Sequence, residues 1–136
     1  MALSKDKGTL QKGGNLLVLA LAAGAVIHGG AIVVIDAGYA NKATTKVGLK
    51  FGGIAEEAVD NSAGGNGEKS IEVRRERLFF AKNSSGDSIA QADLFNQCYL
   101  EDDETVAKTN GGNTRSLAGR IMQVDSNGIW VKGELA

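Results

Sequence analysis

The sequence predicts a mainly β protein, a small single-domain β-sandwich or barrel-like fold with one short helix. Nineteen glycines and no proline indicate many tight turns between short strands. Short apolar runs recur along the chain and are separated by turn residues. The length of 136 residues suits a single core, and 43% hydrophobic with 23% charged residues is ordinary for a globular protein. We therefore expect one β-rich domain over residues 15–136.

The first fourteen residues are expected to form a flexible N-terminal arm. Residues 1–14 (MALSKDKGTLQKGG) are polar, carry lysines and end in two glycines, a composition that contributes little to a core. Such an arm either becomes ordered on a partner or is a frayed terminus without a role. The sequence alone favours neither.

Two apolar runs follow, Leu16 to Ile27 and Ala31 to Ile35, separated by a turn at residues 28–30. The β-branched second run ends at Asp36-Ala-Gly, which predicts a buried strand followed by a turn. The two runs together resemble a hairpin. The leucines and alanines of the first run leave a helix open as the alternative there.

The middle of the chain predicts two further strands and a loop. Residues 46–58 alternate and then reach Gly52-Gly53, which predicts a strand bent by a bulge. Residues 60–69 are polar and glycine-rich, so we expect an exposed, mobile loop. Residues 70–81 (SIEVRRERLFFA) begin and end as a strand, but their charged centre fits neither face of a core. This pattern predicts an edge or protruding strand.

The last third predicts one helix and the clearest hairpin. Ser88 and Gln91 have capping-box spacing, so residues 89–95 are expected to form one or two helical turns before a strand at residues 97–100. Residues 119–132 contain Asn127-Gly between two apolar runs, as in a tight β-hairpin.

No combination of residues predicts a catalytic, cofactor or metal site. His28 is the sole histidine and lies at an expected turn, and Cys98, the sole cysteine, lies within an apolar strand. The stretch GGNGEKS at residues 64–70 lacks the residue order of a phosphate-binding loop. The run Glu101 to Glu104 lacks the alternating spacing of a calcium loop and reads as a solvated turn. We therefore expect no enzymatic activity and no cofactor.

Charge favours local contacts with other protein chains. The formal net charge of −1 provides no global attraction to nucleic acid or to an anionic membrane. Arg74, Arg75 and Arg77 alternate with glutamates, which suits salt bridges between subunits or a plain solvated edge.

The apolar run from Leu16 allows a second interpretation. Lysines precede it and Ala23-Gly-Ala resembles a cleavage site, so a signal peptide over residues 1–25 is the alternative to a buried segment. Twelve apolar residues are too few to span a bilayer. A single cysteine fits a reducing cytoplasm.

Two long stretches, HGGAIVVIDAGYANKATTKVGLKFGGIAEEAVDN and CYLEDDETVAKTNGGNTRSLAGRIMQVDSNGIWV, resemble small head proteins of Mu-like tailed phages and prophages. These proteins are grouped with capsid decoration, or cement, proteins. The resemblance covers about residues 15–131 and rests on the wording of these sequence stretches, residue by residue, and on their order along the chain. No residue in it is a diagnostic chemical motif.

The resemblance implies a compact β-rich virion protein on the capsid exterior, made in the cytoplasm of the host bacterium. Such proteins are often homotrimers that bridge capsomers, with the major capsid protein as partner and no nucleic acid or membrane contact. The hypothesis for partner binding involves the arm and the charged strand, with these residues: Leu3, Lys5, Lys7, Leu10, Arg74, Arg75 and Arg77.

Two other functions remain open from the sequence. A head-completion or tail structural protein is also built from small β-domains without catalytic residues. An exported β-domain that binds a small ligand requires cleavage of the signal peptide described above.

Overall fold

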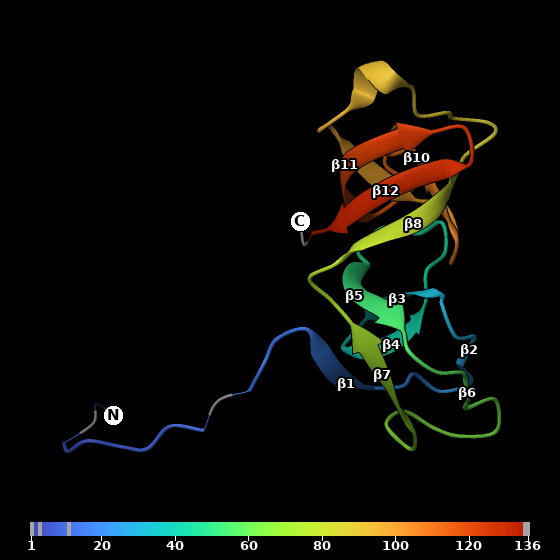
Figure 1. Ribbon diagram of the computed structural model, residues 1–136. Helices are drawn as coiled ribbons and strands as arrows, with labels where there is room; N and C mark the ends of the chain where they lie inside the picture. Colours follow the sequence, from blue (N-terminus) through green and yellow to red (C-terminus); the bar gives the residue numbers. More distant parts are fainter. Residues whose placement is uncertain (1, 3, 11, 135–136) are drawn as a thin grey trace.

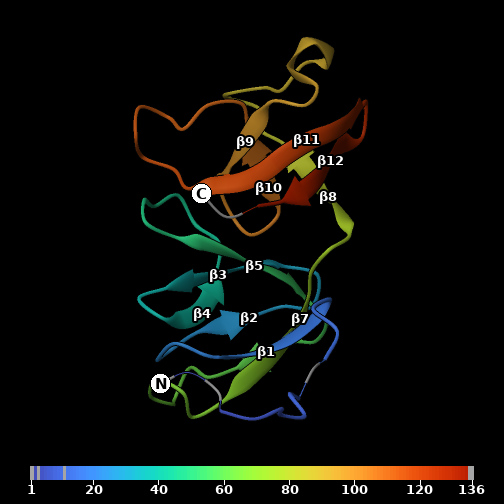
Figure 2. The same ribbon diagram turned by 90° about the vertical axis from the view of Figure 1, so that its left-hand side faces the viewer.

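The computed structural model describes residues 2, 4–10 and 12–134. The protein is mainly β and includes a small barrel and one short helix, as the sequence predicts. Figure 1 shows two β units that follow one another along the chain, with the N-terminal segment extending away from them. Turned by 90°, the barrel lies above the sheet (Figure 2).

The first unit is an antiparallel five-stranded sheet with the order β1-β7-β5-β3-β4. Its strands are β1 (Leu16–Ala20), β3 (Ile32–Asp36), β4 (Tyr39–Lys42), β5 (Lys50–Ala55) and β7 (Ser70–Arg74). A parallel bridge between Leu21 and Ala40 joins the end of β1 to β4. The short strands β2 (Val26–Ile27) and β6 (Val59–Asp60) pair separately.

The second unit is a closed barrel with the order β10-β8-β12-β11-β9. Its elements are β8 (Leu78–Asn83), the 3-10 helix η1 (Gln91–Asp93), β9 (Gln97–Leu100), β10 (Thr105–Ala107), β11 (Leu117–Asp125) and β12 (Gly128–Gly133). Strands β9 and β10 pair and close the barrel. The predicted hairpin is confirmed as β11 and β12, joined by a two-residue turn at residues 126–127.

Strand β3 supplies side chains to two hydrophobic clusters. Ile32 and Val34 belong to a junction cluster that also contains barrel residues such as Ile121, whereas Val33 belongs to a cluster within the sheet unit. Successive side chains of a strand point to opposite faces. A strand buried on both faces needs a continuous apolar run, and this explains why residues 32–34 of the predicted strand are buried, while Ile35 is half-buried.

The predicted bend of the third apolar segment is confirmed at Gly52. Val33 pairs with Gly53 but Val34 pairs with Phe51, so Gly52 is an extra residue in β5. This bulge places Phe51 in the junction cluster and Ala55 in the sheet cluster. Gly53 has φ +146°, and an added Cβ would lie 2.9 Å from the Arg74 carbonyl oxygen. Glycine is therefore needed at this crossing.

The predicted hairpin between residues 16–27 and 31–35 is wrong. The first run divides into β1, which pairs with β7, and β2, which pairs with β6. Strand β3 instead forms a hairpin with β4 across Ala37 and Gly38, which both have positive φ. Apolar runs have the same pattern whichever strand they pair with, so the sequence did not identify the partner.

The predicted edge strand over residues 70–81 is also wrong. The segment divides into β7, which lies between β1 and β5, and β8, which lies between β10 and β12. The charged residues 75–77 form the linker between the two units. These charged side chains do not have to fit into a core, because the chain leaves the sheet there and enters the barrel.

Two smaller predictions need correction. Ser88 does not cap a helix; its hydroxyl donates to the Ser84 carbonyl, and Ala90 N–H instead donates to the Asp93 carboxylate at 2.8 Å. Within the exposed loop at residues 60–69, Asn61 is buried. Its side-chain amide donates to the carbonyls of Ala22 and Gly65, and these bonds hold the loop against the sheet.

Candidate partner-binding surface

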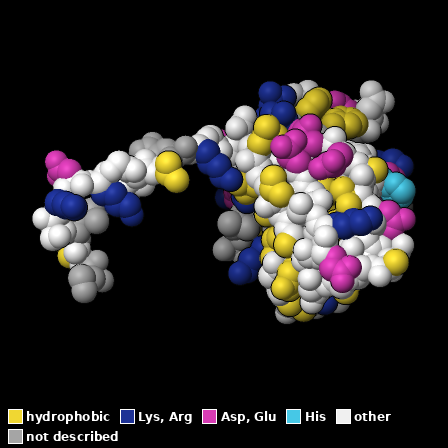
Figure 3. Space-filling view, turned by 90° about the horizontal axis from the view of Figure 1, so that it is seen from below, with side chains coloured by type: hydrophobic (Ala, Val, Ile, Leu, Met, Phe, Trp, Pro, Cys, Tyr) yellow, Lys and Arg dark blue, Asp and Glu magenta, His cyan; other side chains and the backbone are white. Residues whose placement is uncertain are grey.

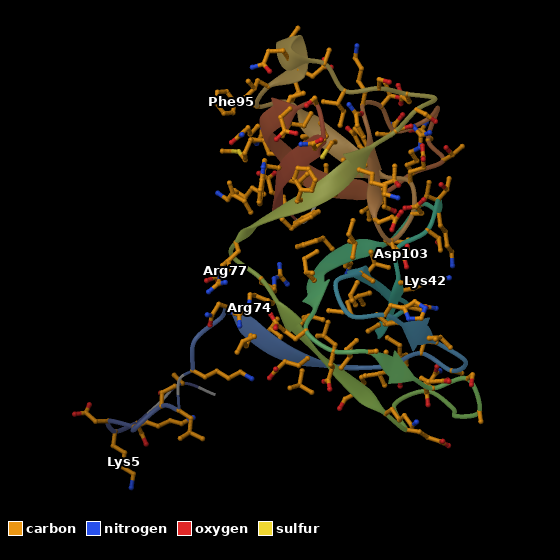
Figure 4. The ribbon with its side chains drawn as sticks, turned by 45° about the vertical axis from the view of Figure 1, so that its right-hand side comes forward. Lys5, Lys42, Arg74, Arg77, Phe95 and Asp103 are labelled. Carbon is orange, nitrogen blue, oxygen red and sulfur yellow. The ribbon has the colours of Figure 1, made fainter. Side chains whose placement is uncertain are left out.

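The N-terminal segment lies outside both β units. Every described residue from 2 to 14 is exposed, and Leu10 has 97% of its surface accessible. Figure 3 shows the segment extending from the body with lysine side chains along it. Lys5 and Lys7 belong to it, and Figure 4 shows Lys5 far from the body. The predicted contact residue Leu3 lies outside the described residues.

The arm begins beside the charged linker. The Asn15 carbonyl accepts a hydrogen bond of 2.7 Å from Arg75 N–H, so the first residue of the body is fixed to the linker backbone. Gly13 and Gly14 precede this bond. The structure therefore brings the root of the arm next to two of the predicted arginines, Arg75 and Arg77, as Figure 4 shows for Arg77.

The three predicted arginines have different surroundings. The Arg74 guanidinium forms an ion pair with Glu56, a short charge-assisted contact within the chain. The Arg75 guanidinium lies 5.9 Å from the centroid of the Phe51 ring, within the range of a cation–π interaction. Arg77 is exposed. Arg75 and Arg77 thus remain available for a partner, whereas Arg74 already has an acidic one.

A groove of about 530 Å³ lies where the arm, the linker and the end of β12 meet. Its lining combines apolar and charged residues, namely Gly14, Leu17, Phe51, Arg75, Glu76, Arg77, Leu78, Lys132 and Gly133. A smaller hollow of about 150 Å³ shares Phe51, Arg75, Arg77 and Leu78 with it. Residues from four separate parts of the chain therefore form one surface.

Sequence reasoning missed most of this surface. Of the three apolar residues at positions 78–80, only Phe79 is buried; Leu78 is 47% and Phe80 45% exposed. The alternation of β8 was a usable signal for this difference. No local pattern indicated that Lys132 lies close to the linker, because the pairing of Leu78 with Lys132 joins strands distant in sequence.

The sole histidine and the sole cysteine have surroundings that are typical of structural residues. His28 is exposed at a turn. Cys98 is buried, and this burial, with a smaller contribution from Glu134, raises the pKa of its thiol to about 12. A thiol with such a pKa stays protonated at neutral pH and is a poor nucleophile. Within the described part of the chain, no cluster of three or more His, Cys, Asp or Glu residues could hold a metal ion.

Two carboxylates of the acidic turn at residues 101–104 form ion pairs within the chain. Glu101 accepts a hydrogen bond from the Ser84 hydroxyl at 2.7 Å and lies 3.5 Å from Arg115 Nη2. Glu104 forms an ion pair with Lys82. These contacts connect the turn to the barrel.

Over the ranges 2, 4–10 and 12–134, the structure has no helix of the length and apolar character needed to cross a membrane. Comparisons with protein-family models, curated proteins and solved structures found no match for this chain.

Proposed function

We propose that this protein is a structural virion protein that binds the outside of a phage capsid and stabilises the lattice by bridging capsomers. The observation that carries the proposal is the exposed arm, which leaves a well-packed β body with Leu10 almost fully accessible. The sequence resemblance to phage decoration proteins supports the same role. In this role the partners are the major capsid protein and further copies of the chain in a homotrimer.

The arm supplies the binding energy in this proposal. Burying a leucine side chain contributes about 1.5–3 kcal/mol, and lysines beside it pair with acidic groups of the shell. In this role the protein binds the assembled shell and not its free subunits, so many bound copies stabilise the lattice by mass action.

The linker has a secondary role in the proposal. Arg75 and Arg77 lie at the root of the arm and extend the same contact surface onto the body. Arg74 contributes to the fold through Glu56 instead. We therefore assign shell contacts to the two arginines that have no acidic partner among the described residues.

The test is to mix the purified protein with empty shells of its phage and to measure occupancy by sedimentation. Deleting residues 1–14 should abolish occupancy while leaving the circular dichroism spectrum unchanged. Leu10→Ser should weaken binding by about tenfold or more, since about 1.4 kcal/mol corresponds to a factor of ten. Val47→Ser, an exposed apolar change on the body, is the matched control and should bind normally.

Full occupancy by the truncated protein would contradict the role of the arm. A single ring of copies at one vertex of the particle would instead indicate a head-completion or tail protein. Sizing the purified protein tests the proposed trimer in the same preparation.

A further inference from the structure

The side chains that line the groove at the junction of sheet and barrel carry a net positive formal charge. Three basic side chains and one carboxylate line it, a formal charge of +2. Arg75, Arg77 and Lys132 form no ion pair with any described residue. Glu76 lies on the arm side, where its Oε1 would be 3.1 Å from a Cβ added at Gly14.

The floor of the groove is apolar and held in place. Phe51 stacks on Phe79 with ring centroids 5.5 Å apart. On another side the ring lies so close to Gly133 that any Cβ there would overlap it. Leu17 and the half-exposed Leu78 complete the floor. A rigid floor lowers the entropy cost of binding.

The cation nearest the floor is also held in place. Arg75 N–H is bonded to the Asn15 carbonyl, and its guanidinium lies over the Phe51 ring. Arginine binds carboxylates through two parallel hydrogen bonds, which gives strong and oriented contacts. A positively charged rim over an apolar floor fits a chain segment that carries both carboxylates and a large apolar side chain.

We propose that this groove binds an acidic segment of another protein, with carboxylates at Arg75, Arg77 and Lys132 and an apolar side chain against Leu17, Phe51 and Leu78. The groove shares Arg75 and Arg77 with the proposed shell contacts, but its lining does not include Leu10 or the lysines of the arm, so peptide binding tests it independently of the arm. Charge complementarity identifies the occupant, because each of the three basic residues lacks an acidic partner within the described chain.

The chain's own segments fit the groove less well. The arm carries Lys5, Lys7 and Lys12 against one aspartate, so its charge repels the rim. In the acidic turn, Glu101 and Glu104 are already paired with Arg115 and Lys82. A second copy could bring Glu101 and Glu104 into the groove only by breaking these pairs.

The probe is a short peptide of aspartate, glutamate and leucine between glycine spacers, titrated into the isotopically labelled full chain. Chemical-shift changes measured by NMR should concentrate on Leu17, Arg77, Leu78 and Gly133. Arg77→Glu should weaken binding by about tenfold or more, because it replaces a charge-assisted hydrogen bond to the peptide with a like-charge contact. Lys42→Glu, an equivalent loss of a cation on the exposed end of β4, is the matched control and should bind normally.

Two peptide controls complete the experiment. Replacing the acidic residues with lysine should abolish binding, and replacing leucine with glycine should weaken it. Equal binding of the acidic and basic peptides, equal loss in the two charge variants, or no localised shifts would overturn the proposal. A chain lacking residues 1–12, which keeps Gly14 in the lining of the groove, should retain peptide binding, so failure of the arm hypothesis is distinguishable from failure of this one.

Discussion

The sheet and the barrel differ in whether the edges of their strands are paired. In the barrel every strand has two neighbours, because β9 and β10 close the ring. In the sheet, among the residues that the structure describes, β1 pairs with β7 alone and β4 with β3 alone, apart from the bridge between Leu21 and Ala40. An open edge presents unpaired backbone groups and favours contact with other chains. Partner binding is therefore expected at the sheet and at the junction rather than around the barrel.

The two units also differ in their cores. The junction cluster contains side chains of both units, including Phe51 from the sheet and Ile129 from the barrel. The second cluster, which includes Leu21 and Ile71, belongs to the sheet unit alone. The barrel thus depends on a core that it shares, while the sheet has a further core of its own. Four substitutions, from the largest expected effect to the smallest, test how the two units are held together.

Phe51→Ala should have the largest effect, because it leaves a cavity in the junction cluster and removes the stacking with Phe79. Phe→Ala changes in a core cost about 3–5 kcal/mol. Urea unfolding followed by circular dichroism measures the loss. Phe95→Ala, at a position that is 60% exposed, is the matched control and should cost less than about 1 kcal/mol. Equal losses would show that the junction is not a core.

Leu21→Ala should destabilise the sheet unit by about 2–5 kcal/mol, because Leu21 is fully buried in the sheet cluster. Hydrogen exchange should show the loss of protection mainly in β1 and β7. The same substitution at the exposed Leu10 should change stability by less than about 0.5 kcal/mol. Loss of protection spread equally over the barrel would contradict separate cores.

Gly53→Ala should cost about 1–3 kcal/mol, because it places a side chain at positive φ and against the Arg74 carbonyl. The substitution tests the bulge that directs β5 to both cores. Gly86→Ala is the control, since a Cβ there would meet nothing within 4 Å. Thermal unfolding should separate the two variants, and a neutral Gly53→Ala would refute the need for glycine at this crossing.

Asp87→Asn should have the smallest effect, a loss of about 1 kcal/mol in the barrel loops. The Thr109 hydroxyl and N–H, and then Arg115, hydrogen-bond the Asp87 carboxylate and lower its pKa. A lowered pKa in the folded state means that the stabilisation is complete above the ordinary value of 3.8 and is lost as the pH falls below it.

Unfolding in urea at pH 7 and pH 3 measures this dependence. The difference in stability between the wild type and Asp87→Asn should shrink at pH 3. A difference that stays constant across this range would show that the charge of Asp87 does not stabilise the loops.

Local patterns in the sequence predicted the elements whose contacts are local. The hairpin of β11 and β12 depends on a short turn between two alternating runs, and β3 is recognised by its β-branched residues. The burial of Cys98 followed from its apolar strand. The groove was beyond such reasoning, because Leu17, Arg77 and Lys132 come from distant segments.

The sequence by itself determined a mainly β fold, the bulge at Gly52 and the composition of the arm. These follow from side-chain shape, glycine conformation and hydrophobic period, which act over a few residues. Only the tertiary structure decided that residues 75–77 connect a sheet to a barrel, that Arg74 is held by Glu56, and that Arg77 and Lys132 line one groove. Strand pairing is decided by long-range packing, and apolar strands of similar pattern do not specify their partners.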